Sequence, residues 1–283
     1  MAIVDHHNLF LTVTRDGDYL KAQCTRLSNR EEAVAWLKCQ VSDLLICDAG
    51  FARYRSPQAA VGYYPLPQAA GIKAHLQAGP ALKQSLGEQY QGLCALLLSE
   101  CIRGVVQAET FLYRERGFGT AAGYDAYWEQ MYLNSCRYYS NLDRIKNSWM
   151  EYVEDKERHQ HLFHRSHTIS VLQEDEELGF IGVFMDSFHE IHIELNLAMD
   201  GVINEISGRV VRAPDAVCYE NSAHIASFRG RNLLHLSKKD IAGVAGGPQG
   251  CNHLVDLLHD ISAAAAGLPF LHPHQKAAQQ RHL

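Results

Sequence analysis

The sequence HTISVLQEDEELGFIGVFM (residues 167–185) predicts the fold of this chain, because it contains two apolar stretches separated by an acidic turn. The run IELNLAMDG (residues 193–201) alternates apolar and polar side chains and predicts a third strand that ends in an Asp-Gly turn. The stretch QGCNHLVDLLHDISAAA (residues 249–265) predicts a helix, since its apolar residues recur at helical spacing. We therefore expect an α+β unit, a three-stranded antiparallel sheet packed with the helices that follow it.

The first half of the chain repeats this order of elements. LFLTVTRDGDYLKAQCTRL (residues 9–27) corresponds to the first two strands, VSDLLICDAG (residues 41–50) to the third, and QGLCALLLSECIRGVV (residues 91–106) to the helix. We expect two tandem copies of one unit, related by a pseudo-two-fold axis. The predicted domains are a degenerate first copy over residues 1–113, a helical connector over 114–160, a second copy over 161–270 and a flexible tail over 271–283.

The predicted connector is rich in aromatic residues. The stretch YDAYWEQMYLNSCRYY (residues 124–139) places Tyr and Trp at helical spacing. Such rings usually pack between domains, so we expect this segment to hold the two halves together. Two functional alternatives remain open: the rings wall a pocket for a flat ligand, or they present a docking surface for a protein partner.

Composition excludes several classes of protein. A formal net charge of −6 and a pI near 6.2 provide no basic patch for binding nucleic acid. Apolar runs such as CALLLSEC (residues 94–101) are too short to cross a bilayer, and the first ten residues do not resemble a secretory signal. The eight cysteines are scattered in apolar context, which is typical of a reducing compartment. We expect a cytoplasmic protein, either a monomeric pseudo-dimer or a homodimer, with no nucleic-acid or membrane partner.

Four side chains of the second copy are candidate metal ligands. They are His189, Cys218, Cys251 and His253. Aligned by hydrophobic pattern, the first copy has Leu37, Val61, Leu93 and Ala95 in their places. The second copy therefore resembles a metal site, and the first copy has apolar side chains at the equivalent positions.

The two cysteines share a predicted position at the start of a helix. Cys218 follows an irregular segment that contains Pro214, and Cys251 follows GGPQG (residues 246–250). Helix N-termini expose unpaired amide groups and a positive dipole end, and both favour the thiolate that binds metals. The alternative is that both are buried small hydrophobic residues.

The histidines come from different places in the sequence. His189 lies at the start of the third strand, while His253 can converge with Cys251 only if that cysteine caps the last helix. His253 is then either a ligand or a hydrogen-bond donor behind one, and Asp186 is the reserve ligand. Thiolate and imidazole donors suit zinc or iron. The spacing differs from that of a zinc finger, so folding must precede metal binding.

The second copy also resembles known families. FHRSHTISV, HEIHIEL and above all GCNHLVDLL resemble an uncharacterised bacterial family, domain of unknown function 2889, whose last helix has a Gly-Cys-Thr-His-Leu-type start. The order of elements is similar, more distantly, to the U-type iron–sulfur scaffold proteins. That likeness implies that Cys218 and Cys251 match two scaffold cysteines and that His189 matches the scaffold aspartate. It also puts Ser187 near the remaining scaffold cysteine, and this departs from the thiolates that a cluster favours.

These observations predict a metal-binding protein of iron–sulfur-scaffold-like fold, with one zinc or iron site in the second copy and a catalytic or cofactor-assembly role. An iron–sulfur cluster is an alternative cofactor. Two other functions remain open. One is an enzyme that uses Cys218 or Cys251 as a nucleophile with a histidine as base. The other is a non-catalytic partner or assembly protein.

Overall fold

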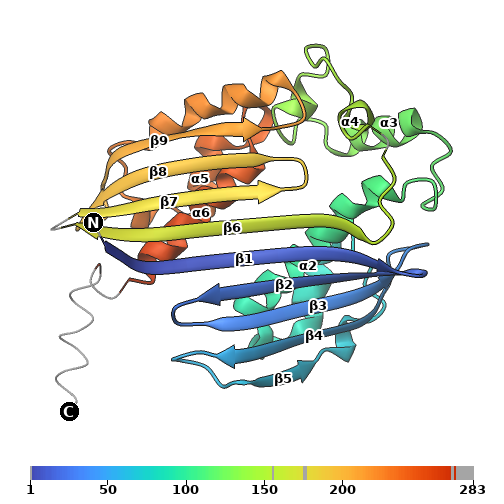
Figure 1. Cartoon of the computed structure of the whole chain (residues 1–283), viewed down its shortest axis with the longest axis horizontal. Helices are drawn as coiled ribbons and strands as arrows, with labels where there is room; N and C mark the ends of the chain where they lie inside the picture. Colours follow the sequence, from blue (N-terminus) through green and yellow to red (C-terminus); the bar gives the residue numbers. More distant parts are fainter. Residues whose placement is uncertain (1, 155, 175–176, 269–270, 272–283) are drawn as a thin grey trace.

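A computed structural model describes residues 2–154, 156–174, 177–268 and 271. Over these residues, nine antiparallel strands form one continuous sheet in the order β5-β4-β3-β2-β1-β6-β7-β8-β9 (Figure 1). The strands are β1 (Ala2–Asp16), β2 (Tyr19–Ser28), β3 (Glu32–Gln40), β4 (Ile46–Arg55), β5 (Gly62–Pro65), β6 (His161–Glu174), β7 (Glu177–Asp186), β8 (Glu190–Ala198) and β9 (Ile203–Arg212). The expected mixture of helices with an antiparallel sheet is confirmed.

Helices follow the strands in each half. The α-helices are α1 (Ala78–Leu86), α2 (Leu93–Ala108), α3 (Ala121–Met131), α4 (Trp149–Tyr152), α5 (Lys238–Ala245) and α6 (Asn252–Ala266). The 3-10 helices are η1 (Pro67–Ala69), η2 (Glu88–Tyr90), η3 (Glu109–Phe111), η4 (Tyr138–Ser140), η5 (Ala216–Phe228), η6 (Leu233–His235) and η7 (Gly247–Gln249). None of the helices in the described residues has the length and hydropathy that crossing a bilayer requires.

The expected pair of three-stranded sheets differs from the structure in two ways. The third strand of the first half is β3, which precedes residues 41–50, and a fourth strand follows it in each half as β4 and β9. β3 and β8 both alternate buried and partly exposed residues, as strands with one covered face do. β9 is a sheet edge with few buried side chains, so its hydrophobic pattern is weak. Pairing of β1 with β6 then joins the two halves into one sheet.

The hydrogen-bond registers of the two halves are equivalent. Leu11 pairs with Cys24 in the first half, and Ile169 pairs with Gly182 in the second half. Corresponding residues of the two halves therefore lie 158 positions apart in the sequence (169 − 11 and 182 − 24). In the central β1–β6 ladder, Leu9 pairs with His167, its own counterpart at that offset. This ladder therefore maps onto itself, which is the pairing that a two-fold axis between the halves requires.

The same offset corrects one part of the sequence alignment. The β2–β3 and β7–β8 ladders keep it, since Gln23 pairs with Trp36 and Ile181 with Glu194. His189 therefore corresponds to Glu31, and the assignment to Leu37 was wrong. The two positions differ by an even number of residues, and a strand pattern of period two looks the same after an even shift.

Helices α2 and α6 cover the same face of the sheet, one in each half (Figure 1). Gly104 of α2 lies against Leu11 and Val13 of β1, while Ile261 of α6 lies against Gly182 of β7. The glycines let helix and strand approach closely where a larger side chain would collide. The apolar faces of these helices are fully buried, and each large side chain contributes roughly 1.5–3 kcal/mol.

The connector lies beyond the strand ends (Figure 1). Its helices have strong N-terminal caps, because Thr120 accepts the amide of Gly123 and Ser148 forms a capping box with Glu151. The backbone N–H of Arg137 donates to the carbonyl of Gly250, just before α6. The connector thus contacts the second half where the candidate ligands lie. The predicted tail, except Leu271, lies outside the described residues.

Candidate metal centre

The loop between β7 and β8 places two of the candidate residues. Asp186 is the last residue of β7, and its side chain is buried. Its Oδ1 atom accepts the backbone N–H groups of Phe188 at 2.8 Å and His189 at 2.7 Å. In this turn the carboxylate of Asp186 takes the place of a backbone carbonyl. The turn fixes the direction in which the side chain of His189 points.

The imidazole of His189 is oriented by the same carboxylate. Its Nδ1 atom lies 3.1 Å from Oδ1 of Asp186. Burial would raise the pKa of Asp186, but His189 and Arg165 outweigh burial and hold it well below its usual range. A carboxylate can only accept, so Nδ1 of His189 carries the hydrogen and Nε2 remains available. This is the arrangement that holds metal-binding histidines in place.

His253 lies in the first turn of α6, beside His189. The two ring centroids are 4.2 Å apart, and Phe184 packs on His253 at 4.8 Å. Side-chain ligand atoms of Asp186, His189 and His253 all lie within 4.8 Å of one another. Burial, with help from His189 and Arg165, lowers the pKa of His253 well below its usual value. His253 is therefore a neutral imidazole with a free lone pair.

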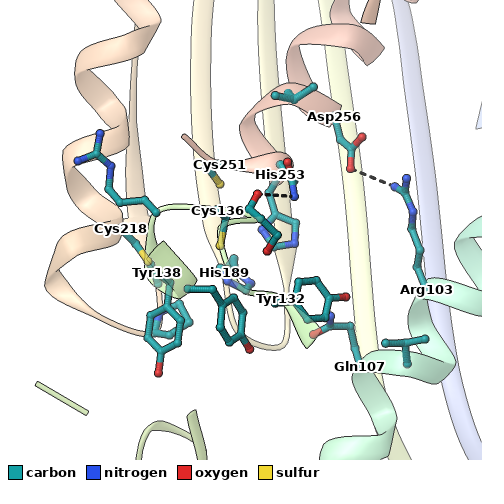
Figure 2. Close-up of a pocket in the computed structure, with 18 of the residues that line it drawn as sticks. Arg103, Gln107, Tyr132, Cys136, Tyr138, His189, Cys218, Cys251, His253 and Asp256 are labelled. Atoms are coloured by element: carbon teal, nitrogen blue, oxygen red, sulfur yellow. Dashed lines mark hydrogen bonds and ion pairs between the residues drawn. The ribbon is translucent and has the colours of Figure 1, made fainter. Parts of the chain in front are cut away.

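The two predicted cysteines line the same cavity as the histidines (Figure 2). Cys251 is the N-cap of α6, as expected, and Cys218 lies in η5, whose cap is Asp215. Among the described residues, the close group of ligand atoms contains neither cysteine. The structure thus brings His189 and His253 together with Asp186, and it leaves the cysteines nearby in the wall.

The thiols are protonated in this environment. Burial raises the pKa of Cys218 to about 12 and that of Cys251 to about 12. The amides of His253 and Leu254 lower the pKa of Cys251, but their effect is smaller than that of burial. Burial therefore opposes the thiolate that the sequence predicts at these helix starts. A metal ion would have to displace the thiol proton to gain such a ligand.

The cavity has a volume of about 600 Å³ and also holds residues that the sequence did not single out. Tyr132, Cys136 and Tyr138 of the connector form part of its wall (Figure 2). Burial raises the pKa of Cys136 as well. Cys136 lies among tyrosines in the sequence, and only the position of the connector over the second half shows that it faces the other two thiols.

A chain of ion pairs links the site to the first half. Arg165 of β6 donates to Oδ2 of Asp186 at 3.1 Å and to Glu100 of α2 at 3.3 Å. Glu100 also pairs with Arg103 at 2.9 Å, and Arg103 pairs with Asp256 of α6 at 3.0 Å (Figure 2). The sequence carried one signal of this network: Glu100 lies on the apolar face of its helix, where a buried charge needs a partner.

Residues 177–266 match the family model described as protein of unknown function (DUF2889). The expected resemblance to this family is confirmed for the second half of the chain. No curated protein and no solved structure matches the chain, so the likeness to iron–sulfur scaffold proteins stays a prediction. The matched segment contains every candidate ligand, namely Asp186, His189, Cys218, Cys251 and His253.

Proposed function

We propose that this protein binds one transition-metal ion, zinc or iron, through the imidazoles of His189 and His253. The observation that carries the proposal is the convergence of the ligand atoms of Asp186, His189 and His253 within 4.8 Å in the wall of a cavity. These residues come from a hairpin loop and a helix start that are far apart in the sequence. Their convergence is a property of the folded chain.

The donor set suits a borderline metal. His253 is held neutral, and His189 has its Nε2 free because Nδ1 faces Asp186. Asp186 accepts from two backbone amides, His189 and Arg165, so its role is to orient His189. Imidazole is a preferred ligand of zinc and iron, and a thiolate from Cys251 or Cys218 would complete such a set.

A catalytic role is favoured over a purely structural one. Structural zinc sites are closed by four protein ligands, whereas these imidazoles border a cavity large enough for a small molecule. A metal with an open position would supply Lewis-acid chemistry, polarising an oxygen of a bound molecule. An iron–sulfur cluster has less support, because the residues that converge offer nitrogen and oxygen atoms and a cluster favours thiolates.

One observation favours a second function. The pair of Asp186 and His189 also has the geometry of a general base held by a carboxylate, facing a cavity. Catalysis by a cysteine nucleophile has less support, because burial raises the pKa of Cys218 and Cys251 and keeps both as thiols. Activity that survives complete removal of metal by a chelator would favour the acid–base function.

Elemental analysis of protein purified without a histidine tag tests the proposal. After dialysis against zinc and then buffer, we expect about one equivalent in the wild type and below about a tenth in His189→Ala or His253→Ala. His192→Ala is the matched control, because His192 lies on β8 and bonds Glu190 outside the site. A wild type that retains less than about a third of an equivalent of zinc or iron would refute metal binding.

A further inference from the structure

The cavity beside His189 and His253 has the dimensions of a small-molecule site. Its volume of about 600 Å³ lies within the range of clefts that enclose drug-sized ligands. Apolar side chains from both halves line it, including Ile102 of α2, Ile191 of β8 and Val210 of β9. Because segments from both halves line it, the cavity forms only when the whole chain is folded.

One wall of the cavity is a row of aromatic rings from the connector. Trp128 lies 5.1 Å from Tyr132, which stacks on Tyr139 at 5.2 Å with an interplanar angle of 25°. Tyr138 then meets Tyr139 edge-on at 5.0 Å. Tyr132 and Tyr139 already stack on each other, so an aromatic ligand would meet their edges; this edge-to-face geometry needs the flat π face that a puckered ring lacks.

Two tyrosine hydroxyls of this row are unused. Tyr138 donates to the carbonyl of Asn147, but no described residue is hydrogen-bonded to the hydroxyl of Tyr132 or Tyr139. Burial raises the pKa of Tyr132 to about 12, so its hydroxyl is a donor at neutral pH. The aromatic wall therefore offers hydrogen bonds as well as ring faces.

A buried cation at one end of the cavity offers an unused hydrogen-bond donor. The cationic lining residues are Arg103, Arg137, Arg165 and Lys238, and each is paired with a carboxylate, so the net charge of the lining is largely balanced. The side chain of Arg165 is 4% exposed, and its Nε atom has no hydrogen-bond partner among the described residues. A metal held by two neutral imidazoles would add further positive charge. An anionic oxygen that enters beside Arg165 would accept the unused Nε–H group of this guanidinium.

We infer that the cavity binds a planar aromatic carboxylate, with its ring against Tyr132 and Tyr139 and its carboxylate toward His189 and His253. This inference rests on the proposed function for the metal that would receive the carboxylate. The aromatic wall and the unused Nε donor of Arg165 are independent of the metal. A carboxylate oxygen is also a normal ligand of zinc and iron, so one anion would satisfy both the metal and the unused donor of Arg165.

Three probes separate planarity from charge. Benzoate is planar and anionic, cyclohexanecarboxylate is anionic but puckered, and benzamide is planar but neutral. In calorimetric titrations of the full-length, metal-loaded protein, we expect benzoate to bind about tenfold more tightly than either of the other two. Equal affinities for benzoate and cyclohexanecarboxylate would overturn the inference.

Two tyrosine variants test where the aromatic ring of benzoate binds. Tyr132→Leu and Tyr139→Leu should each weaken benzoate by about three- to tenfold and leave cyclohexanecarboxylate unchanged. Tyr54→Leu is the matched control, because Tyr54 lies on β4 and is 63% exposed. Thermal melting checks that each variant is folded, and the two tyrosine variants are independent of each other. Benzoate binding that neither variant changes would also overturn the inference.

Failure of the metal proposal is distinguishable from failure of this one. Suppose that elemental analysis shows the protein to be metal-free, yet benzoate still binds and its binding depends on Tyr132. This result would support the aromatic site and refute the metal proposal. If the protein binds about one equivalent of metal but shows no preference for benzoate, the metal proposal is supported and the aromatic site is refuted. Loss of the preference for benzoate over benzamide in His189→Ala, with the preference over cyclohexanecarboxylate retained, would place the carboxylate at the imidazole end.

Discussion

The Nδ1 atom of His189 lies 3.1 Å from the Oδ1 atom of Asp186, which also closes the loop that carries the imidazole. The corresponding loop of the first half is built in the same way. There, Ser28 accepts the amide of Glu31 at 2.9 Å through its hydroxyl, and its own amide donates to the carbonyl of Glu31. One loop geometry is thus used twice, with a carboxylate and an imidazole in one half and a hydroxyl and a glutamate in the other.

Replacing Asp186 by Asn should weaken both metal binding and folding. Asn cannot supply the negative charge that orients His189 and pairs with Arg165. We expect metal affinity to fall by roughly 10–100-fold and the free energy of unfolding to fall by about 3–5 kcal/mol. Competition with a chromogenic chelator measures the first quantity, and urea unfolding measures the second.

The matched control is Glu194→Gln, which removes an exposed carboxylate from β8 without touching the loop. It should bind metal and unfold like the wild type. If Asp186→Asn also retains wild-type metal affinity, the carboxylate does not orient His189 for a metal.

Replacing Glu100 by Gln tests whether the first half supports the site. Glu100 is buried and pairs with Arg165, which in turn pairs with Asp186. We expect the free energy of unfolding to fall by about 3 kcal/mol, because Arg165 loses one of its two buried anionic partners. Metal affinity should fall less than in Asp186→Asn. Urea unfolding and chelator competition are the measurements, with the exposed Glu88→Gln as the control. An unchanged stability would show that the network between the halves contributes nothing.

Asp256 predicts a pH dependence of stability. Burial would raise its pKa, but Arg103 and Lys238 outweigh burial and lower it from 3.8 to about 2. Since the folded-state pKa is depressed, the ionised carboxylate stabilises the fold above about pH 4, and this contribution is lost as the pH falls towards 2. Asp256→Asn should lower the free energy of unfolding by about 2 kcal/mol at neutral pH.

Urea unfolding of wild type and Asp256→Asn as a function of pH makes the measurement. The difference between the two proteins should shrink as the pH falls from about 4 to about 2. Asp48→Asn, on the exposed side of β4, should show no difference at any pH. A difference that stays constant with pH would mean that lost packing, and not the ion pairs, destabilises the variant.

The cysteines predict an order of alkylation. Cys47 is exposed, whereas burial raises the pKa of Cys218 and Cys251 to about 12. We expect iodoacetamide at neutral pH to modify Cys47 first and the two cavity thiols at least about 100-fold more slowly. Mass spectrometry of peptides at successive times gives the rates. Rapid alkylation of Cys218 or Cys251, unaffected by added zinc, would instead support a thiol nucleophile.

Local patterns determined much of the fold. The sequence Asp-Gly-Asp at residues 16–18 marks the turn between β1 and β2, and Gly17 has the positive φ of 60° that such a turn requires. The start of α6 next to Cys251 was also predicted, because Gly and Pro before an apolar helical pattern mark a helix start. These features depend on neighbours in the chain, so they are visible in the sequence. The position of β3 was missed because residues 41–50 also contain an apolar run, and because β3 has apolar residues on both of its faces, including Val34 and Trp36.

The sequence by itself determined which residue types were available: a histidine in a hairpin loop, a histidine in the first turn of a helix, and cysteines close to helix starts. Only the tertiary structure decided which of them meet. His189 and His253 come together because α6 lies across β7 with its first turn beside the loop, and Arg165 reaches Glu100 because β1 pairs with β6. Such contacts depend on how whole elements pack, and packing leaves no period in the sequence.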